Sequence, residues 1–135
     1  MMTTVKATYL GDLRIECEHL QSGTKIITDA PTDNHGKGES FSPTDLCASA
    51  LAACMMTIMG LYAQNAGLDV KGTEIEITKV MATNPRRIGE VIVTFHMPDR
   101  AYTEKDKKAL ERAALTCPVH YSLGKQVKQT ITFEW

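Results

Sequence analysis

Hydrophobic and polar residues alternate with a period of two in the first part of the chain, which is the pattern of a β-strand. One such run extends from Val5 to Leu10. A second places Leu13, Ile15 and Cys17 on one face, with charged residues between them. A third run, over residues 25–28, leads into a loop rich in Gly, Pro, Asp and Asn. The pattern therefore predicts three strands before the first helix.

A helix start follows the loop. Ser42 has the residue type of an N-cap, Pro43 suits the first helical position, and Asp45 places an acid three residues after the cap. No charged residue occurs from 46 to 63, and about 20 apolar residues are enough to cross a bilayer. The many alanines and the polar stop at 64–67 favour a core helix over a membrane span. A helix that is apolar on all sides is expected to be buried on all sides.

The remainder of the chain predicts a hairpin, two helices and a closing strand. The two hairpin strands flank an Asn-Pro turn, a Thr cap opens the first helix, and a Cys-Pro step opens a short second one. These elements are expected over residues 73–81, 88–97, 103–114, 119–123 and 127–135. The order βββ-α-ββ-α-β indicates one α+β domain over residues 1–135, with helices on one face of an antiparallel sheet.

Composition narrows the class of protein. The 135 residues are 43% hydrophobic and 23% charged, as in ordinary globular domains. Fifteen basic and sixteen acidic side chains give a net charge of −1, so neither nucleic acid nor an anionic membrane is an expected partner. The first ten residues carry no secretory signal pattern, which predicts a cytoplasmic protein. Nucleotide-binding and familiar hydrolase motifs do not occur, so thiol chemistry is what remains.

Four cysteines are the candidates for that chemistry. In a reducing compartment they are expected to be free, metal-bound or catalytic rather than a disulfide frame. Cys17 lies on a strand face and is interpreted as a core residue, which is also the default for Cys47 and Cys54 in a buried helix. Three alanines just before Cys54 leave room beside its thiol. Such small neighbours indicate either tight helix packing or a pocket.

Cys117 has a different local setting. It precedes Pro118 at the start of a short helix, where unpaired N–H groups and the helix dipole stabilise a thiolate. A zinc site using Cys117 and His120 would need two further ligands, and no second closely spaced Cys/His pair exists. We therefore expect neither a metal nor an organic cofactor, and we interpret His120 as a surface or supporting residue.

Taken together, the motifs resemble the OsmC/Ohr superfamily of osmotically induced and organic hydroperoxide resistance proteins. The resemblance covers nearly the whole chain. It implies an OsmC-like α+β fold with a long buried central helix, assembled as an intertwined homodimer. The motifs that carry it are Ser42–Leu46, Leu51–Cys54, Pro85–Ile88 and Cys117–Ser122.

The resemblance also implies an activity. It places Cys54 where the family has its peroxide-attacking thiol and Cys117 where it has the resolving thiol. The implied function is reduction of organic hydroperoxides in oxidative-stress defence, with a dithiol as the reductant. The alternative is a redox-inactive OsmC-like dimer that binds a small apolar ligand.

Two positions depart from the family pattern. Peroxidase members have a Glu directly after the Pro of the helix start, whereas this chain has Thr44 there and its acid one place later, at Asp45. Arg14 is the best match for the activating arginine of the family. Asp45 is the candidate supporting acid, and whether the two replace the Arg-Glu pair of the family is left open. Arg14 is equally well explained as a strand residue that balances Glu16 and Glu18.

Helix electrostatics and the resemblance disagree on which thiol reacts first. The helix terminus favours a thiolate at Cys117, whereas Cys54 lies in mid-helix and gains little from the dipole. We follow the resemblance and assign first attack to Cys54, on the condition that Arg14 or another cation acts on it.

Overall fold

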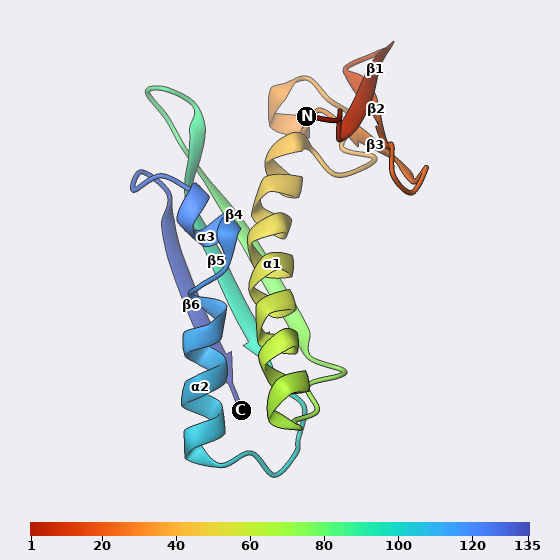
Figure 1. Cartoon of the computed structure of the whole chain (residues 1–135). Helices are drawn as coiled ribbons and strands as arrows, with labels where there is room; N and C mark the ends of the chain where they lie inside the picture. The colour runs from red at the N-terminus through yellow and green to blue at the C-terminus, as the bar shows by residue number, and fades with distance from the viewer. The chain divides into compact units, whose positions relative to one another are not determined.

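The computed structural model describes all 135 residues, which form two compact units (Figure 1). The N-terminal unit is Met1–Leu46 and the C-terminal unit is Cys47–Trp135. Their boundary lies inside the first helix, which begins at Pro43. The single-domain organisation of residues 1–135 stays a prediction.

The N-terminal unit is built on a three-stranded antiparallel sheet of order β1-β2-β3. All three predicted strands are confirmed. Ala7, Cys17 and Ile26 lie opposite one another across the three strands, so they share one face. That face is poorly covered, because Ile26 is exposed and Cys17 only half-buried. The elements are β1 (Val5–Gly11), β2 (Arg14–His19), β3 (Lys25–Asp29) and the 3-10 turn η1 (Thr32–Asn34).

Helix α1 spans Pro43–Ala66 and begins where the sequence predicts. The Ser42 N–H donates to Asp45 Oδ2 over 2.9 Å, and the Asp45 N–H donates to Ser42 Oγ over 3.0 Å. These two bonds form a capping box, in which each residue satisfies a backbone donor of the other. Loss of such a cap costs about 1 kcal/mol. Asp45 therefore fixes the start of the helix that carries Cys54.

Within one chain, α1 is buried on one side only, so its burial on all sides stays a prediction that depends on a partner. Its buried residues recur at helical spacing and occupy one face: Ala48, Leu51, Ala52, Met55, Met59 and Ala63. Ala53, Thr57 and Leu61 lie on the exposed side. The sheet and the second helix of the C-terminal unit cover only one side of the cylinder. By length and composition alone α1 could also cross a membrane, but its inner face belongs to the protein core.

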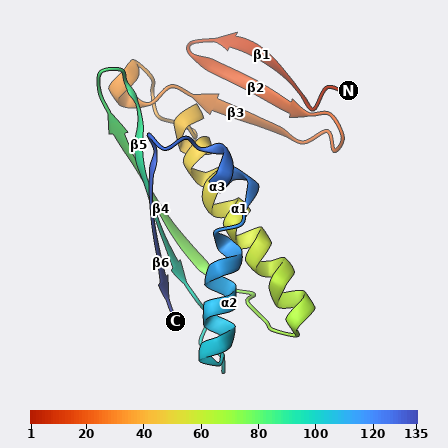
Figure 2. The same ribbon diagram turned by 60° about the vertical axis from the view of Figure 1, so that its left-hand side comes forward.

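The C-terminal unit has a second sheet, of order β4-β5-β6, with α1 and α2 on one side of it (Figure 2). Strands β4 and β5 form the predicted antiparallel hairpin. Strand β6 pairs parallel to β5, which differs from the expected all-antiparallel sheet. The chain leaves the end of β5 and returns through the helices to its start, and such a crossover yields a parallel pair. The elements are β4 (Glu74–Ala82), β5 (Arg87–His96), α2 (Glu104–Ala114), α3 (Pro118–Ser122) and β6 (Lys128–Glu134).

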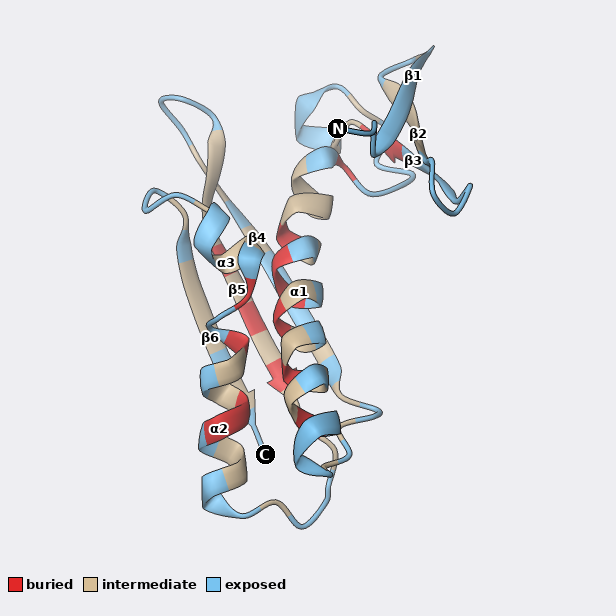
Figure 3. Cartoon of the chain, viewed as in Figure 1, coloured by how far each residue is buried: buried red, intermediate tan, exposed pale blue.

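The core of the C-terminal unit lies between this sheet and the helices (Figure 3). Val91, Val93 and Phe95 of β5 are almost fully buried and belong to one cluster with the inner face of α1. Leu110 of α2 and Cys117 belong to the same cluster. The α+β class is therefore confirmed. At the junction between α2 and α3, Cys117 is buried in the core, whereas Leu115, Thr116 and Pro118 are exposed.

Candidate functional site

Cys54 lies at the border of the buried face of α1. It follows Leu51 by three positions and precedes Met55 by one, and both of these side chains have 0% exposure. Cys54 itself is half-buried and packs against the core. The alanines beside it do not share one environment, since Ala52 is buried whereas Ala53 is exposed. The thiol thus lies between core and surface.

Cys117 is the N-cap of α3 and has 0% exposure. Pro118 begins the helix, as the sequence predicts, and the His120 N–H donates to Cys117 Sγ over 3.2 Å. The short helix thereby supplies one backbone donor to the sulfur, in a site that water does not reach.

Cys54 is close enough to Cys117 to influence its pKa. Burial is the main reason that the pKa of the Cys117 thiol is raised, and the side chain of Cys54 raises it further through a hydrogen bond and through charge. The backbone N–H groups of His120 and Val119 act in the opposite direction but do not outweigh burial. The expectation that Cys117 is a favoured thiolate is therefore wrong. Loss of solvation exceeds the effect of the helix terminus.

Arg14 lies in the N-terminal unit, on β2. Its guanidinium contacts Asp29 Oδ2 at 3.4 Å and Glu39 Oε2 at 2.5 Å. Asp29 has 1% exposure. The Glu39 backbone N–H is the main reason that the pKa of the Asp29 carboxyl is lowered. Burial raises this pKa, and the Arg14 charge lowers it further. The sequence left the partner of Arg14 open, with Asp45 as the candidate, and did not reveal Asp29 and Glu39.

The register of the sheet is the signal that identifies Asp29. Arg14 and Asp29 are direct partners in the β2–β3 ladder. An Arg and an Asp at equivalent positions of two predicted antiparallel strands form a cross-strand ion pair. Glu39 has no comparable signal, since it lies in an irregular loop ten residues later.

A pair of residues beside Cys117 was also overlooked. His120 Nδ1 lies 2.5 Å from Oε1 of Gln129 on β6, and Gln129 Nε2 donates to the His120 carbonyl over 3.2 Å. His120 had been interpreted as a surface or supporting residue, whereas it is half-buried and tied to β6 at two points. No group of three or more His, Cys, Asp or Glu side chains has an arrangement that could hold a metal ion.

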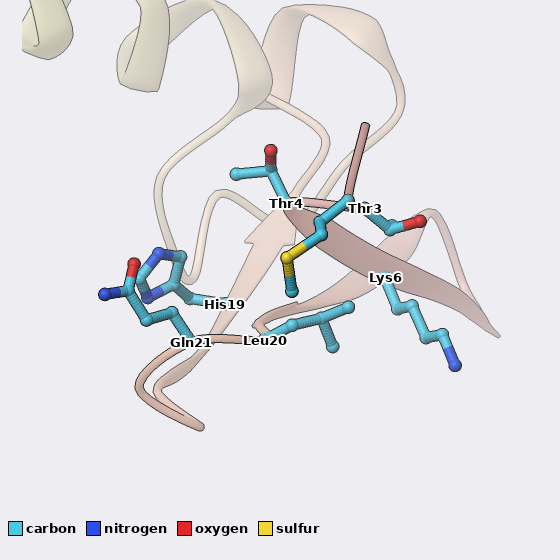
Figure 4. A pocket seen from close by; sticks show the side chains of 7 residues that line it. Thr3, Thr4, Lys6, His19, Leu20 and Gln21 are labelled. Carbon is cyan, nitrogen blue, oxygen red and sulfur yellow. The ribbon is translucent and has the colours of Figure 1, made fainter.

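The N-terminal unit contains a cavity of about 810 Å³ that involves none of the predicted site residues (Figure 4). It lies where the chain enters β1 and leaves β2. Five polar side chains, one methionine and one leucine surround it, and no thiol is among them. Its lining is Met2, Thr3, Thr4, Lys6, His19, Leu20 and Gln21.

Comparison with known proteins agrees with this architecture. A family model described as OsmC-like protein matches residues 36–132. The chain is 48% identical to a crystal structure from Psychrobacter arcticus 273-4, assigned to an osmotic stress induced and detoxification response protein. The TM-score is 0.95, over 99% of this chain and 97% of that one. No curated protein matches the chain in sequence.

More distant structures share the fold. An OsmC like protein from Mycoplasma pneumoniae has a TM-score of 0.78 at 21% identity, over 99% of this chain and 96% of that one. An organic hydroperoxide resistance protein OsmC from Legionella pneumophila has a TM-score of 0.76 at 17% identity, over 100% and 99%. At these identities the likeness concerns the fold alone.

The geometry predicts how the two thiols influence each other. In a protein that lacks Cys17 and Cys47, Cys54→Ala is expected to lower the pKa of Cys117, because one of the groups that raise it is removed. Burial remains, so the pKa should stay above that of an exposed thiol. Ultraviolet thiolate absorbance as a function of pH measures this. An unchanged Cys117 titration after Cys54→Ala would show that the two thiols do not interact.

Proposed function

The chain belongs to the OsmC-like protein family, and on this premise we propose that it is a thiol-dependent peroxidase that reduces organic hydroperoxides through Cys54 and Cys117. The observation that carries the proposal is the pairing of a half-buried thiol with a fully buried one in an apolar core. A peroxide can approach the half-buried sulfur from outside. The buried sulfur can react only with its neighbour.

The first step oxidises Cys54. Its thiolate attacks the terminal oxygen of the hydroperoxide, a sulfur–oxygen bond forms, and the oxygen–oxygen bond breaks. The alkoxide leaves as an alcohol after taking a proton, and Cys54 becomes a sulfenic acid. Sulfur loses two electrons and the peroxide gains them.

The second step joins the two sulfurs. Cys117 attacks the sulfur of the Cys54 sulfenic acid, the sulfur–oxygen bond breaks, and hydroxide leaves as water with the thiol proton of Cys117. A cellular dithiol then attacks the disulfide and passes through a mixed disulfide, which returns both cysteines to thiols. The raised pKa of Cys117 suits this order, because a protonated buried thiol does not compete for peroxide.

Arg14 and Asp45 have supporting roles in this proposal. Cys54 must be a thiolate to attack, and its mid-helix position gains little from the helix dipole. We assign the stabilising positive charge to Arg14 on the family resemblance alone, since in the structure its guanidinium pairs with Asp29 and Glu39. Asp45 acts through structure, since its capping box fixes the first turn of the helix that carries Cys54.

Single cysteine substitutions test the enzyme directly. Cys54→Ser should abolish consumption of cumene hydroperoxide in the presence of a dithiol, because a serine hydroxyl is not ionised near neutral pH. Cys117→Ser should undergo one oxidation and then stall as sulfenic or sulfinic acid. Cys47→Ser is the matched control, one thiol removed from the same helix, and should keep the parent rate.

Two outcomes would contradict these roles. If Cys117→Ser never reacts while Cys54→Ser still accumulates sulfenic acid, the roles of the two cysteines are reversed. If the folded parent consumes neither cumene hydroperoxide nor hydrogen peroxide, the ligand-binding alternative replaces the enzyme.

The role of Arg14 is tested by removing its charge. If Arg14 has this role, Arg14→Gln should slow oxidation of Cys54 by about tenfold at neutral pH, because the cation that favours the ionised thiol is removed. Lys6→Gln is the control, since it removes one positive charge from the neighbouring strand. Stopped-flow measurement of the first oxidation step distinguishes the two. Equal rates for both variants would remove Arg14 from the mechanism.

We also propose that the protein is a homodimer. Two surfaces of the single chain support this. The apolar face of the N-terminal sheet leaves Val5, Tyr9 and Ile26 exposed at 44%, 61% and 47%. The outer side of α1 exposes Ala53 and Leu61. Apolar surface of this kind marks an interface.

The dimer is tested by its mass in solution. Light scattering should give twice the 14.9 kDa of one chain at micromolar concentration. Leu61→Glu should shift the mass toward one chain, because it places a charge on the outer side of α1. Glu111→Gln, on α2, is expected to leave the mass unchanged. A parent mass of one chain at micromolar concentration would reject the dimer.

A further inference from the structure

Cys117 depends on a very short helix for its hydrogen bond. Helix α3 has five residues, fewer than an isolated helix needs to be stable in water. The donor to Cys117 Sγ is the His120 N–H. The position of that donor must therefore be fixed by contacts outside the helix.

Gln129 provides such contacts from β6. Its Nε2 group donates to the His120 carbonyl, and its Oε1 faces His120 Nδ1 at 2.5 Å. The amide orientation follows from the pair of bonds, since only the NH₂ group can donate to a carbonyl. His120 Nδ1 must then carry a hydrogen. The Gln129 side chain thus holds both the backbone and the ring of His120, and the His120 N–H donates to Cys117 Sγ.

We propose that Gln129 is a positioning residue for the resolving thiol: by clamping His120 it holds the His120 N–H on Cys117 Sγ and stabilises the sulfur as it becomes anionic. This inference rests on the proposed function, because it concerns the step in which Cys117 attacks the Cys54 sulfenic acid. A hydrogen bond to an anion is stronger than one to a neutral group. The donor therefore favours the reacting form of Cys117 over its resting thiol.

The backbone N–H groups of α3 matter to Cys117 because the side chains around it are apolar. The titratable group that acts on Cys117 is Cys54 of α1, which raises its pKa. The backbone N–H groups of His120 and Val119 lower that pKa. From β5 the core presents Val91, Val93 and Phe95, and β6 contributes the uncharged Gln129. In a buried apolar site, the N–H groups of α3 are what favour ionisation.

The first test measures Cys117 without any peroxide. The starting protein has Cys117 as its only cysteine, with serine at positions 17, 47 and 54. Gln129→Leu should move the thiolate titration to higher pH, as should His120→Phe, which removes the ring but keeps the backbone. The double variant should be no worse than the larger single effect, because both substitutions break one clamp. Thr132→Val, an exposed polar-to-apolar change on the same strand, is the control.

The second test measures the resolving step in a protein that keeps Cys54 and Cys117. After one equivalent of cumene hydroperoxide, Gln129→Leu should form the disulfide about tenfold more slowly at neutral pH, which corresponds to one weakened hydrogen bond to an anion. The preceding oxidation of Cys54 should keep its rate. Raising the pH should restore much of the disulfide rate in the variant, which a general loss of structure would not allow.

The outcomes separate this inference from the enzyme proposal. A Cys117 titration that Gln129→Leu and His120→Phe both leave unchanged, in folded protein, overturns the clamp. If the titration moves as expected but the parent consumes no peroxide, the clamp stands and the peroxidase proposal fails. Additive effects of the two substitutions would show that Gln129 does not act through His120.

Discussion

Packing of one face of α1 against β5 is the constraint on which the site depends. Leu51, Met55 and Met59 are fully buried against a strand that contributes Val91 and Phe95 to the same core. Burial of each such side chain contributes about 1.5–3 kcal/mol. Because protein interiors are close-packed, these contacts fix the rotation of the helix about its axis. Cys54 is held by that rotation at the edge of the buried face.

The same packing gives the two thiols different exposure to solvent. Cys54 keeps some exposure, whereas Cys117 is sealed at the junction of α2 and α3. Burial raises the pKa of Cys117 despite the N–H donors of its helix. One fold therefore supplies a half-buried thiol and a fully buried thiol whose pKa is raised. That difference in environment is what a two-step thiol mechanism requires.

Local signals in the sequence predicted most of the elements and their bounds. The capping box at Ser42, the hairpin and the Cys117-Pro118 helix start each depend on a few neighbouring residues. The parallel β5–β6 pair and the one-sided burial of α1 depend on contacts between distant segments, and the sequence pattern did not reveal them.

For the candidate site too, the sequence predicted local features and not contacts between distant segments. The family resemblance predicts roles for Cys54 and Cys117, which stay predictions. It does not predict the balance between burial and helix electrostatics at Cys117, because burial is a property of the folded chain. Gln129 was overlooked because nothing in a strand sequence shows that a glutamine will reach a histidine on a separate helix. The partners of Arg14 were hidden for the same reason, apart from the strand register that pairs it with Asp29.

The central claim is that Cys54 and Cys117 act as one redox pair. Peptide mass mapping without reduction, after one equivalent of an organic hydroperoxide, tests it most directly. The account predicts one new cross-linked species, in which the peptide carrying Cys54 is joined to the peptide carrying Cys117 and two hydrogens are lost. Cys17 and Cys47 should remain reduced. Recovery of Cys54 as sulfinic acid beside a free Cys117 thiol would contradict the claim, as would recovery of both as unmodified thiols.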